Sequence, residues 1–208
     1  MKMKSIAICI ALVTLSSSAF AEGYVGLGVG QGKMSFPSIS TTYLGYPITG
    51  AGDKTTDTSY KLYGGYNFTQ NWGVEVGYND FGNGYSVKGT ISGTPYTISD
   101  MKGHSWYVAG TGTLPLQNGF SLFAKLGVAE NHTDGGSACV SGNCGSVGSE
   151  NHSSVLYGVG ASYNFTKQWA ARLEYEDFGK VTSDDVWGTG GSGAVKASAW
   201  TLSAKYSF

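Results

Sequence analysis

The sequence predicts an all-β fold, an eight-stranded antiparallel up-and-down transmembrane β-barrel. A seventeen-residue hairpin motif occurs twice, apolar and polar side chains alternate along eight segments, and short connections alternate with long ones. All three features are typical of bilayer-spanning strands, because such strands face lipid on one side and the barrel interior on the other.

The repeated motif covers residues 66–82 and, ninety-seven residues later, residues 163–179. Both copies begin with Tyr-Asn-Phe-Thr, continue to a tryptophan, and end with Tyr-x-Asp-Phe-Gly. We interpret each copy as the end of one strand, a turn of about three residues and a complete second strand. In the first copy the apolar face runs from Trp72 to Tyr78, and aromatic residues at both ends of an apolar face suit a strand that crosses a bilayer.

The N-terminus has the layout of a secretory signal peptide. Lys2 and Lys4 precede an apolar run over residues 6–15, and an Ala-x-Ala cleavage site ends at Ala21. We therefore predict a signal peptide at 1–21, cleaved after Ala21, and a barrel domain at 22–208. A membrane anchor is the weaker alternative, since a helix needs about 20 apolar residues to cross a bilayer.

The composition is unlike that of an ordinary soluble domain. Glycine accounts for 33 of 208 residues and charged residues for 13%, against usual shares of about 7% and about 25%. The formal net charge is −1 and no basic cluster occurs, which argues against nucleic acid as a partner. Beyond the signal peptide no apolar run reaches the length of a spanning helix, so a membrane protein of this composition must be a closed barrel.

The predicted strands share one pattern, in which an apolar or aromatic residue set alternates with a small, polar or charged set. In chain order they cover residues 23–35, 58–68, 72–81, 104–114, 120–130, 153–165, 169–178 and 195–208. At about 10 residues each, and tilted by about 45°, they are long enough to cross the hydrocarbon layer.

The connections between the predicted strands alternate in length. Three are short, at 69–71, 115–119 and 166–168. Four are long, at 36–57, 82–103, 131–152 and 179–194. Short periplasmic turns and longer outer loops are the pattern of outer-membrane barrels, and an even number of strands returns the C-terminus to the side of the turns.

Charged residues on the non-lipid face are predicted to point into the barrel, where they avoid a cost of about 2–4 kcal/mol for each Lys or Arg at the bilayer midplane. Small glycines on the same face leave room for them. An eight-stranded barrel is about wide enough for side chains to fill, so we expect an ion-pair network that closes the lumen. The alternative is a permeation path lined by the same residues: Lys61, Glu75, Lys125, Arg172, Glu174 and Lys205.

Aromatic residues at the ends of the apolar faces are predicted to form girdles at the two membrane interfaces. They are Trp72, Tyr78, Trp106, Trp169, Tyr175 and Trp200.

Two cysteines lie in the third long connection. Cys139 and Cys144 are flanked by glycines, and an exported chain meets an oxidising environment, so we predict a disulfide between them. His132 and His152 flank the pair, which leaves a Cys₂His₂ zinc site as an alternative. The spacing is loose for zinc, and we predict no metal and no cofactor.

The chain resembles the small eight-stranded outer-membrane barrels of the OmpA transmembrane-domain and opacity-protein superfamily. The doubled Tyr-Asn-Phe-Thr…Trp…Tyr-x-Asp-Phe-Gly hairpins and the C-terminal residues 202–208 carry the resemblance. It implies a bacterial outer-membrane location. The terminal Tyr206-Ser207-Phe208 resembles the aromatic-ended signal read by barrel assembly machineries, and the alternative is that Tyr206 and Phe208 belong to an aromatic girdle.

We expect a structural and interactive protein, not an enzyme, whose surface loops serve adhesion or recognition. The expected partners are outer-membrane lipid and lipopolysaccharide, the assembly machinery with its periplasmic chaperones, and an unknown loop ligand. One alternative is a narrow porin for small solutes. Another is a lipid A-modifying esterase, because His152-Ser153-Ser154 distantly resembles the His-x-Ser of lipid A deacylases, although no carboxylate nearby in the sequence would orient the histidine.

Overall fold

The computed structural model describes residues 22–43, 45–182 and 194–208. The predicted signal peptide and most of the predicted connection 179–194 lie outside these residues. Within the described part of the chain no helix is long and apolar enough to cross a membrane. The strands are β1 Glu22–Ser35, β2 Ile39–Tyr43, β3 Tyr46–Lys54, β4 Thr56–Asn67, β5 Trp72–Asp80, β6 Tyr85–Ile91, β7 Thr94–Pro115, β8 Phe120–Asp134, β9 Ser137–Val140, β10 Asn143–Ser146, β11 Ser149–Asn164, β12 Trp169–Lys180 and β13 Lys196–Ser207.

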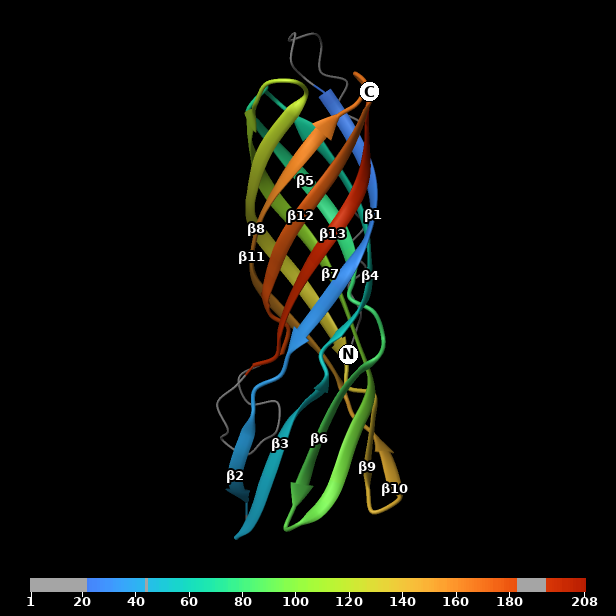
Figure 1. Ribbon diagram of the computed structural model, residues 1–208. Helices are drawn as coiled ribbons and strands as arrows, with labels where there is room; N and C mark the ends of the chain where they lie inside the picture. Colours follow the sequence, from blue (N-terminus) through green and yellow to red (C-terminus); the bar gives the residue numbers. More distant parts are fainter. Residues whose placement is uncertain (1–21, 44, 183–193) are drawn as a thin grey trace, which may run out of the picture.

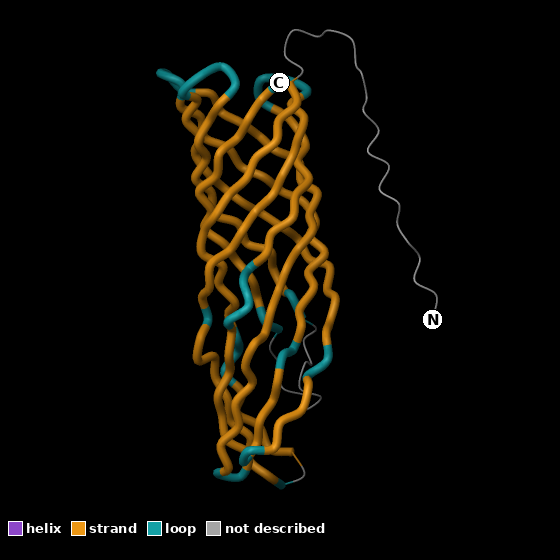
Figure 2. The backbone as a smooth tube through the Cα atoms, turned by 90° about the vertical axis from the view of Figure 1, so that its right-hand side faces the viewer, coloured by secondary structure: helices purple, strands orange, loops and turns teal. Residues whose placement is uncertain are grey.

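Eight of these strands pair into a closed ring, which confirms the predicted fold. Around the ring they follow the order β1, β4, β5, β7, β8, β11, β12 and β13, and β13 pairs again with β1. Every pair is antiparallel. The strands are tilted against the barrel axis (Figures 1 and 2), and a closed ring leaves no exposed strand edge.

The long connections contain more structure than the sequence predicts. Four barrel strands, β4, β8, β11 and β12, extend two to four residues into the predicted long connections, and β7 begins ten residues before the predicted start at 104. Segments predicted as loops also contain five further strands, namely β2, β3, β6, β9 and β10. These strands lie beyond the barrel, at the bottom of Figure 1. We call this the loop end, and the opposite end, with the three short connections, the turn end.

The further strands and the first part of β7 form a second sheet, the surface sheet, in the order β2, β3, β6, β7, β9 and β10. Its buried apolar residues include Val87, Tyr96 and Ile98. Tyr96 lies across two glycines: a Cβ added to Gly50 would come within 2.2 Å of the Tyr96 hydroxyl, and one added to Gly89 within 2.6 Å of the ring. Because β7 runs through both sheets, the surface sheet continues the barrel wall.

The outer face of the barrel is apolar and carries aromatic residues at two levels. At the turn end Trp72 is 67% exposed, and the Trp169 ring packs on Tyr206 with ring centres 5.0 Å apart. Nearer the loop end, cross-strand aromatic pairs form the second level: Tyr78 packs on Trp106 at 4.8 Å and Tyr175 on Trp200 at 5.1 Å. This arrangement matches the two girdles of a membrane barrel.

The repeated motif builds the same turn twice at the turn end. The Thr69 hydroxyl accepts a hydrogen bond from the Trp72 amide at 3.0 Å, and the Thr166 hydroxyl accepts one from the Trp169 amide at 2.9 Å. In each copy a short side chain therefore satisfies a turn amide, as threonine often does.

The Asp-Phe-Gly of the motif also forms the same structure twice, near the loop end. Asp80 accepts a hydrogen bond from the Gly82 amide and Asp177 from the Gly179 amide, both at 2.8 Å. Gly82 has a φ of 97° and Gly179 a φ of 67°, which glycine adopts at little cost. The chain bends there, and the phenylalanine between the two residues stays on the inner face.

Candidate functional site

Six charged side chains meet inside the barrel, and we call this group the ion cluster. The Lys125 ammonium lies within 2.8 Å of a carboxylate oxygen of each of the three glutamates. The Lys61 ammonium lies 2.6 Å from Glu174 and 2.7 Å from Glu176. The two lysine side chains and the three carboxylates are 0% exposed. The members are Lys61 on β4, Glu75 on β5, Lys125 on β8, and Arg172, Glu174 and Glu176 on β12.

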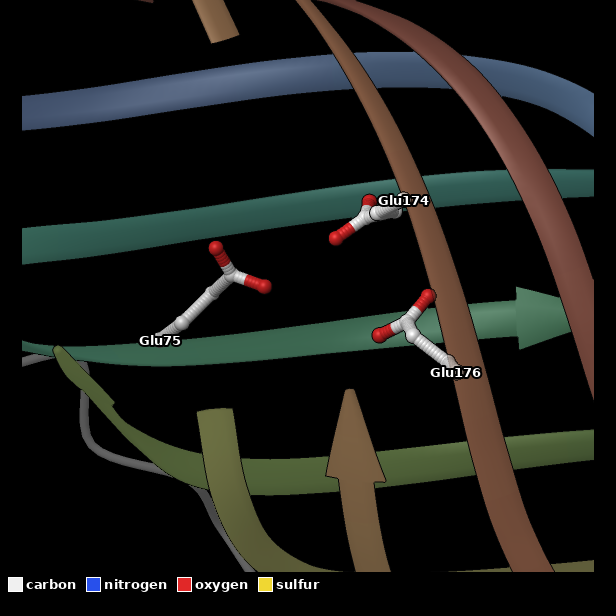
Figure 3. Close-up of side chains that lie close together, drawn as sticks. All are labelled: Glu75, Glu174 and Glu176. Carbon is white, nitrogen blue, oxygen red and sulfur yellow. The ribbon is translucent and has the colours of Figure 1, made fainter. Parts of the chain in front are cut away.

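The cluster is electrically balanced, with three cations against three carboxylates. The carboxylates converge from β5 and β12 (Figure 3). Such a group could hold a metal ion, but lysine ammonium groups bridge its oxygens here. Because buried charges are costly unless they are paired, the balance explains how so many charges fit into one barrel.

The two copies of the repeated motif supply the two partners of one ion pair that crosses the lumen. Glu75 and Arg172 occupy equivalent positions in the two copies of the motif, ninety-seven residues apart, and Arg172 Nη1 donates to Glu75 Oε2 at 2.8 Å. The guanidinium also reaches Glu174 at 3.2 Å, and its carbon lies 4.2 Å from the centre of the Phe123 ring.

Glycines make room for the aromatic rings that surround the cluster. In four cross-strand pairs a ring lies over the glycine directly opposite, where an added Cβ would come within 2.2–2.5 Å of it. Two of these tyrosines donate hydrogen bonds to Glu75, Tyr24 at 3.1 Å and Tyr107 at 2.8 Å. The pairs are Tyr24 over Gly65, Tyr63 over Gly26, Tyr107 over Gly77 and Phe123 over Gly160.

The structure brings together five of the six predicted lumen residues and separates the sixth. Lys205 lies nearer the turn end, with its ammonium 5.1 Å from the centre of the Tyr24 ring and outside the ion cluster. The prediction that Lys205 belongs to the network was therefore wrong. Lys205 lies on the same inner face as the ion cluster, but at a different level along the barrel axis. Glu176 was missed, although it alternates with the lipid-facing Tyr175 and so has the same parity as Glu174.

An apolar plug closes the barrel on the loop-end side of the ion cluster. It consists of Met34, Phe81, Leu156 and Phe178, which are all 0% exposed. The two phenylalanines of the repeated Asp-Phe-Gly meet edge to face, with ring centres 4.9 Å apart. The ion cluster and the apolar plug thus fill successive levels of the lumen.

A polar cavity of about 420 Å³ lies on the other side of the ion cluster, at the turn end. Arg172 and Lys205 line it together with hydroxyl and amide side chains, and among the described residues of the lining Glu22 is the acidic one.

The predicted disulfide is present, and it joins opposed residues of the β9–β10 hairpin in the surface sheet. It uses the thiols of Cys139 and Cys144 that the zinc alternative would need as ligands. His132 contacts Asn151 at 2.6 Å and Asp134 at 3.4 Å.

Elsewhere in the surface sheet, the Lys88 ammonium lies 2.9 Å from Asp53 and lowers the pKa of that carboxyl, chiefly through their hydrogen bond. Burial raises the pKa of Tyr96 in the sheet core.

The residues considered for an esterase have other partners. The Ser153 hydroxyl donates to Glu130, and the Ser154 hydroxyl donates to the carbonyl of Phe178. Among the described residues no hydrogen bond joins His152 to either serine, so the histidine–serine pair that the lipid A deacylase resemblance requires does not form.

The C-terminal aromatic residues lie on the outer face at the turn end. The Phe208 amide donates to the Gly23 carbonyl at 3.0 Å, which fixes the last residue to β1. The Phe208 side chain is 74% exposed. This position suits both a girdle residue and a recognition signal.

Comparison with known proteins agrees with this architecture. Outer membrane protein P5 of Haemophilus influenzae is 29% identical over 191 residues, which cover 84% of this chain and 51% of that protein. The chain thus spans about half the length of the curated relatives it matches.

Two solved structures share the fold. The outer membrane protein OprG of Pseudomonas aeruginosa has a TM-score of 0.58 at 14% identity, covering 91% of this chain and 97% of that chain. Ail, the attachment invasion locus protein of Yersinia pestis, solved in complex with the heparin analogue sucrose octasulfate, has a TM-score of 0.52 at 18% identity, covering 91% and 99%.

The family model for the outer membrane protein beta-barrel domain matches residues 6–208. The closed ring of eight antiparallel strands agrees with this match, and the family match and the outer-membrane relatives confirm the predicted location in the bacterial outer membrane. The chain belongs to the outer membrane protein beta-barrel domain family.

Proposed function

We propose that this protein is a closed outer-membrane barrel that presents its surface sheet for adhesion or recognition and contributes to envelope structure. The observation that carries the proposal is the filled lumen. An ion cluster and an apolar plug occupy successive levels of the barrel, while the first three long connections form a sheet with its own core.

The filled lumen argues against rapid permeation. Each glutamate of the ion cluster is already paired with buried cations, so an ion entering the lumen would have to disrupt these pairs. Beyond the cluster it would meet Phe81 and Phe178, which are 0% exposed and offer no polar group. The turn-end cavity is the observation that favours the narrow porin, since it provides a polar entrance.

The surface sheet suits recognition because it is folded and exposes varied chemistry. Its outer positions include Tyr46, which is 60% exposed, a Thr49–Thr90 hydroxyl pair at 3.0 Å and the Lys88–Asp53 ion pair. The disulfide fixes the β9–β10 hairpin at one edge. Ail shows that a barrel of this fold can bind a sulfated ligand, and we assign the surface sheet a ligand of its own, without enzymatic activity.

The outer face accounts for the remaining partners. The two levels of aromatic residues place the barrel among outer-membrane lipid and lipopolysaccharide. We assign Tyr206 and Phe208 to recognition by the assembly machinery, with periplasmic chaperones carrying the unfolded chain.

Conductance in planar bilayers tests the closed lumen. The wild-type protein should conduct weakly, and the double variant Phe81→Ala, Phe178→Ala should conduct more, because it removes the largest rings of the plug. Val108→Ala, on the lipid face, is the control and should leave conductance unchanged. Large, steady, ion-selective channels in the wild type would overturn the closed lumen and support the porin.

Binding to whole cells tests recognition separately. Cells that display the wild type should bind members of a glycan and matrix-protein array that they lose when residues 38–53 and 84–100 are each replaced by a short turn. Equal binding by both cell types, with equal amounts of barrel in the membrane, would contradict a recognition role for the surface sheet.

A further inference from the structure

The turn-end cavity is lined by a lysine, Lys205, that takes no part in the charge balance of the ion cluster. The cluster itself is balanced, three against three. Lys205 lies outside that balance: across the described residues no carboxylate oxygen comes within 4.0 Å of its ammonium, which lies instead beside the Tyr24 ring. Glu22 lines the same cavity but lies beyond ion-pair distance of this partly buried lysine, whereas charges in such surroundings are normally paired.

Arg172 supplies a second unsatisfied group at the same place. Its two terminal nitrogens bind Glu75 and Glu174, but its Nε is buried without a hydrogen-bond partner. The side chain is 5% exposed and lines the cavity. A buried N–H left unpaired is costly, so a small movement that let a molecule in the cavity accept from this nitrogen would remove that cost.

The uncharged part of the lining also supplies donors. The hydroxyls of Thr111, Ser121 and Ser162 belong to three neighbouring strands and line the cavity, and Ser162 lies 3.3 Å from Ser121. Hydroxyls can donate to an anion. Glu22 lies among the turn-end residues of the lining, where cleavage after Ala21 would add a positively charged amino group.

We propose that this cavity is a binding site for a small oxyanion, a solute with a phosphate or carboxylate group, that enters from the turn end. Lys205 provides charge, Arg172 Nε a directed hydrogen bond, and the hydroxyls complete the coordination. A volume of about 420 Å³ lies within the range of small-molecule sites, about 300–1,000 Å³.

The ion cluster closes the site on its loop-end side, so bound solutes leave by the turn end, through which they entered. The proposal is independent of the recognition role of the surface sheet. In an outer-membrane barrel with periplasmic turns, the ligand would come from the periplasm.

Calorimetric titration of the refolded mature barrel with pyrophosphate tests the site, with citrate in a second arm to compare phosphate with carboxylate. We expect saturable binding of at least one of the two. Lys205→Met should weaken it about tenfold or more, as expected for loss of a charge-assisted hydrogen bond. Lys33→Met, which removes an exposed lysine of the same β1–β13 seam, is the matched control and should bind as the wild type does. Absence of saturable binding in both arms, or equal weakening in the two variants, would overturn the proposal.

A second measurement uses only the wild-type barrel, so its result does not depend on whether a variant folds. Pyrophosphate or citrate should slow acetylation of Lys205 in the wild-type barrel, measured by mass spectrometry, and should leave acetylation of Lys33 unchanged. Equal protection of both lysines, or protection of neither, would refute a site in the cavity.

Discussion

Replacing Lys125 by methionine should destabilise the barrel more than replacing any exposed lysine. Its ammonium contacts all three glutamates at 2.7–2.8 Å, and its side chain is 0% exposed. Lys125→Met keeps most of the side-chain length but leaves three buried carboxylates with two cations. Breaking a buried ion pair in this way costs about 3–5 kcal/mol, a large part of the about 5–15 kcal/mol that stabilises a typical protein.

The free energy of unfolding can be measured in urea on protein refolded into lipid vesicles, with tryptophan fluorescence and heat-modifiable gel migration as readouts. Lys88→Met is the matched control. The Lys88 and Asp53 side chains are 60% and 43% exposed, and such a surface pair contributes about 0–1 kcal/mol.

A second substitution that restores the charge balance makes this prediction specific. Adding Glu176→Gln to Lys125→Met leaves two carboxylates with two cations, so the double variant should lose less stability than the sum of the two single variants. Additive losses, or equal losses for Lys125→Met and Lys88→Met, would refute the view that a balanced charge network stabilises the lumen.

Three further predictions concern the other features. Thiol alkylation without reductant, read by mass spectrometry, should label neither Cys139 nor Cys144 in protein from cells, and reducing their bond should barely change barrel stability because it closes a small ring; two labelled cysteines would contradict the bond. Deleting Phe208 should lower the amount assembled in cells far more than the stability of refolded protein, and equal losses would favour a girdle role alone. Gly77→Val should weaken the barrel by about 1–3 kcal/mol through overpacking against the Tyr107 ring, and unchanged urea unfolding would show that the ring can move aside.

The period of two along the strands is what made the barrel predictable. Lipid requires an apolar residue at every second position, so Trp72 to Tyr78 and its copy revealed both the strands and the residues that point inward. Parity alone is sufficient to direct Glu75, Lys125 and Arg172 into the lumen. The resemblance to a barrel family pointed to the same fold.

Depth along the barrel axis was not predictable in the same way. Lys205 and Glu176 have equally clear parity, but strand tilt and register decide which residues of different strands lie at one level, and neither can be read from alternation. Phe81 has the parity of Glu75 and so was predictable as an inward residue, but its contact with Phe178 across the lumen depends on the same register and tilt. The surface strands lack a lipid face, and segments such as 46–54 contain too many small and polar residues to show an apolar alternation.

The distribution of the ion cluster along the chain has a consequence for biogenesis. Lys61, Glu75 and Lys125 come from β4, β5 and β8, whereas the other three members lie together on β12, near the end of the chain. A partly inserted sheet without β12 would hold two lysines and one glutamate in the hydrocarbon layer, and each misplaced lysine costs about 2–4 kcal/mol at the midplane. Membrane insertion should therefore be less favourable for a chain that lacks β12 than for one that contains it. The charges that fill the finished barrel thus disfavour insertion of chains truncated before β12.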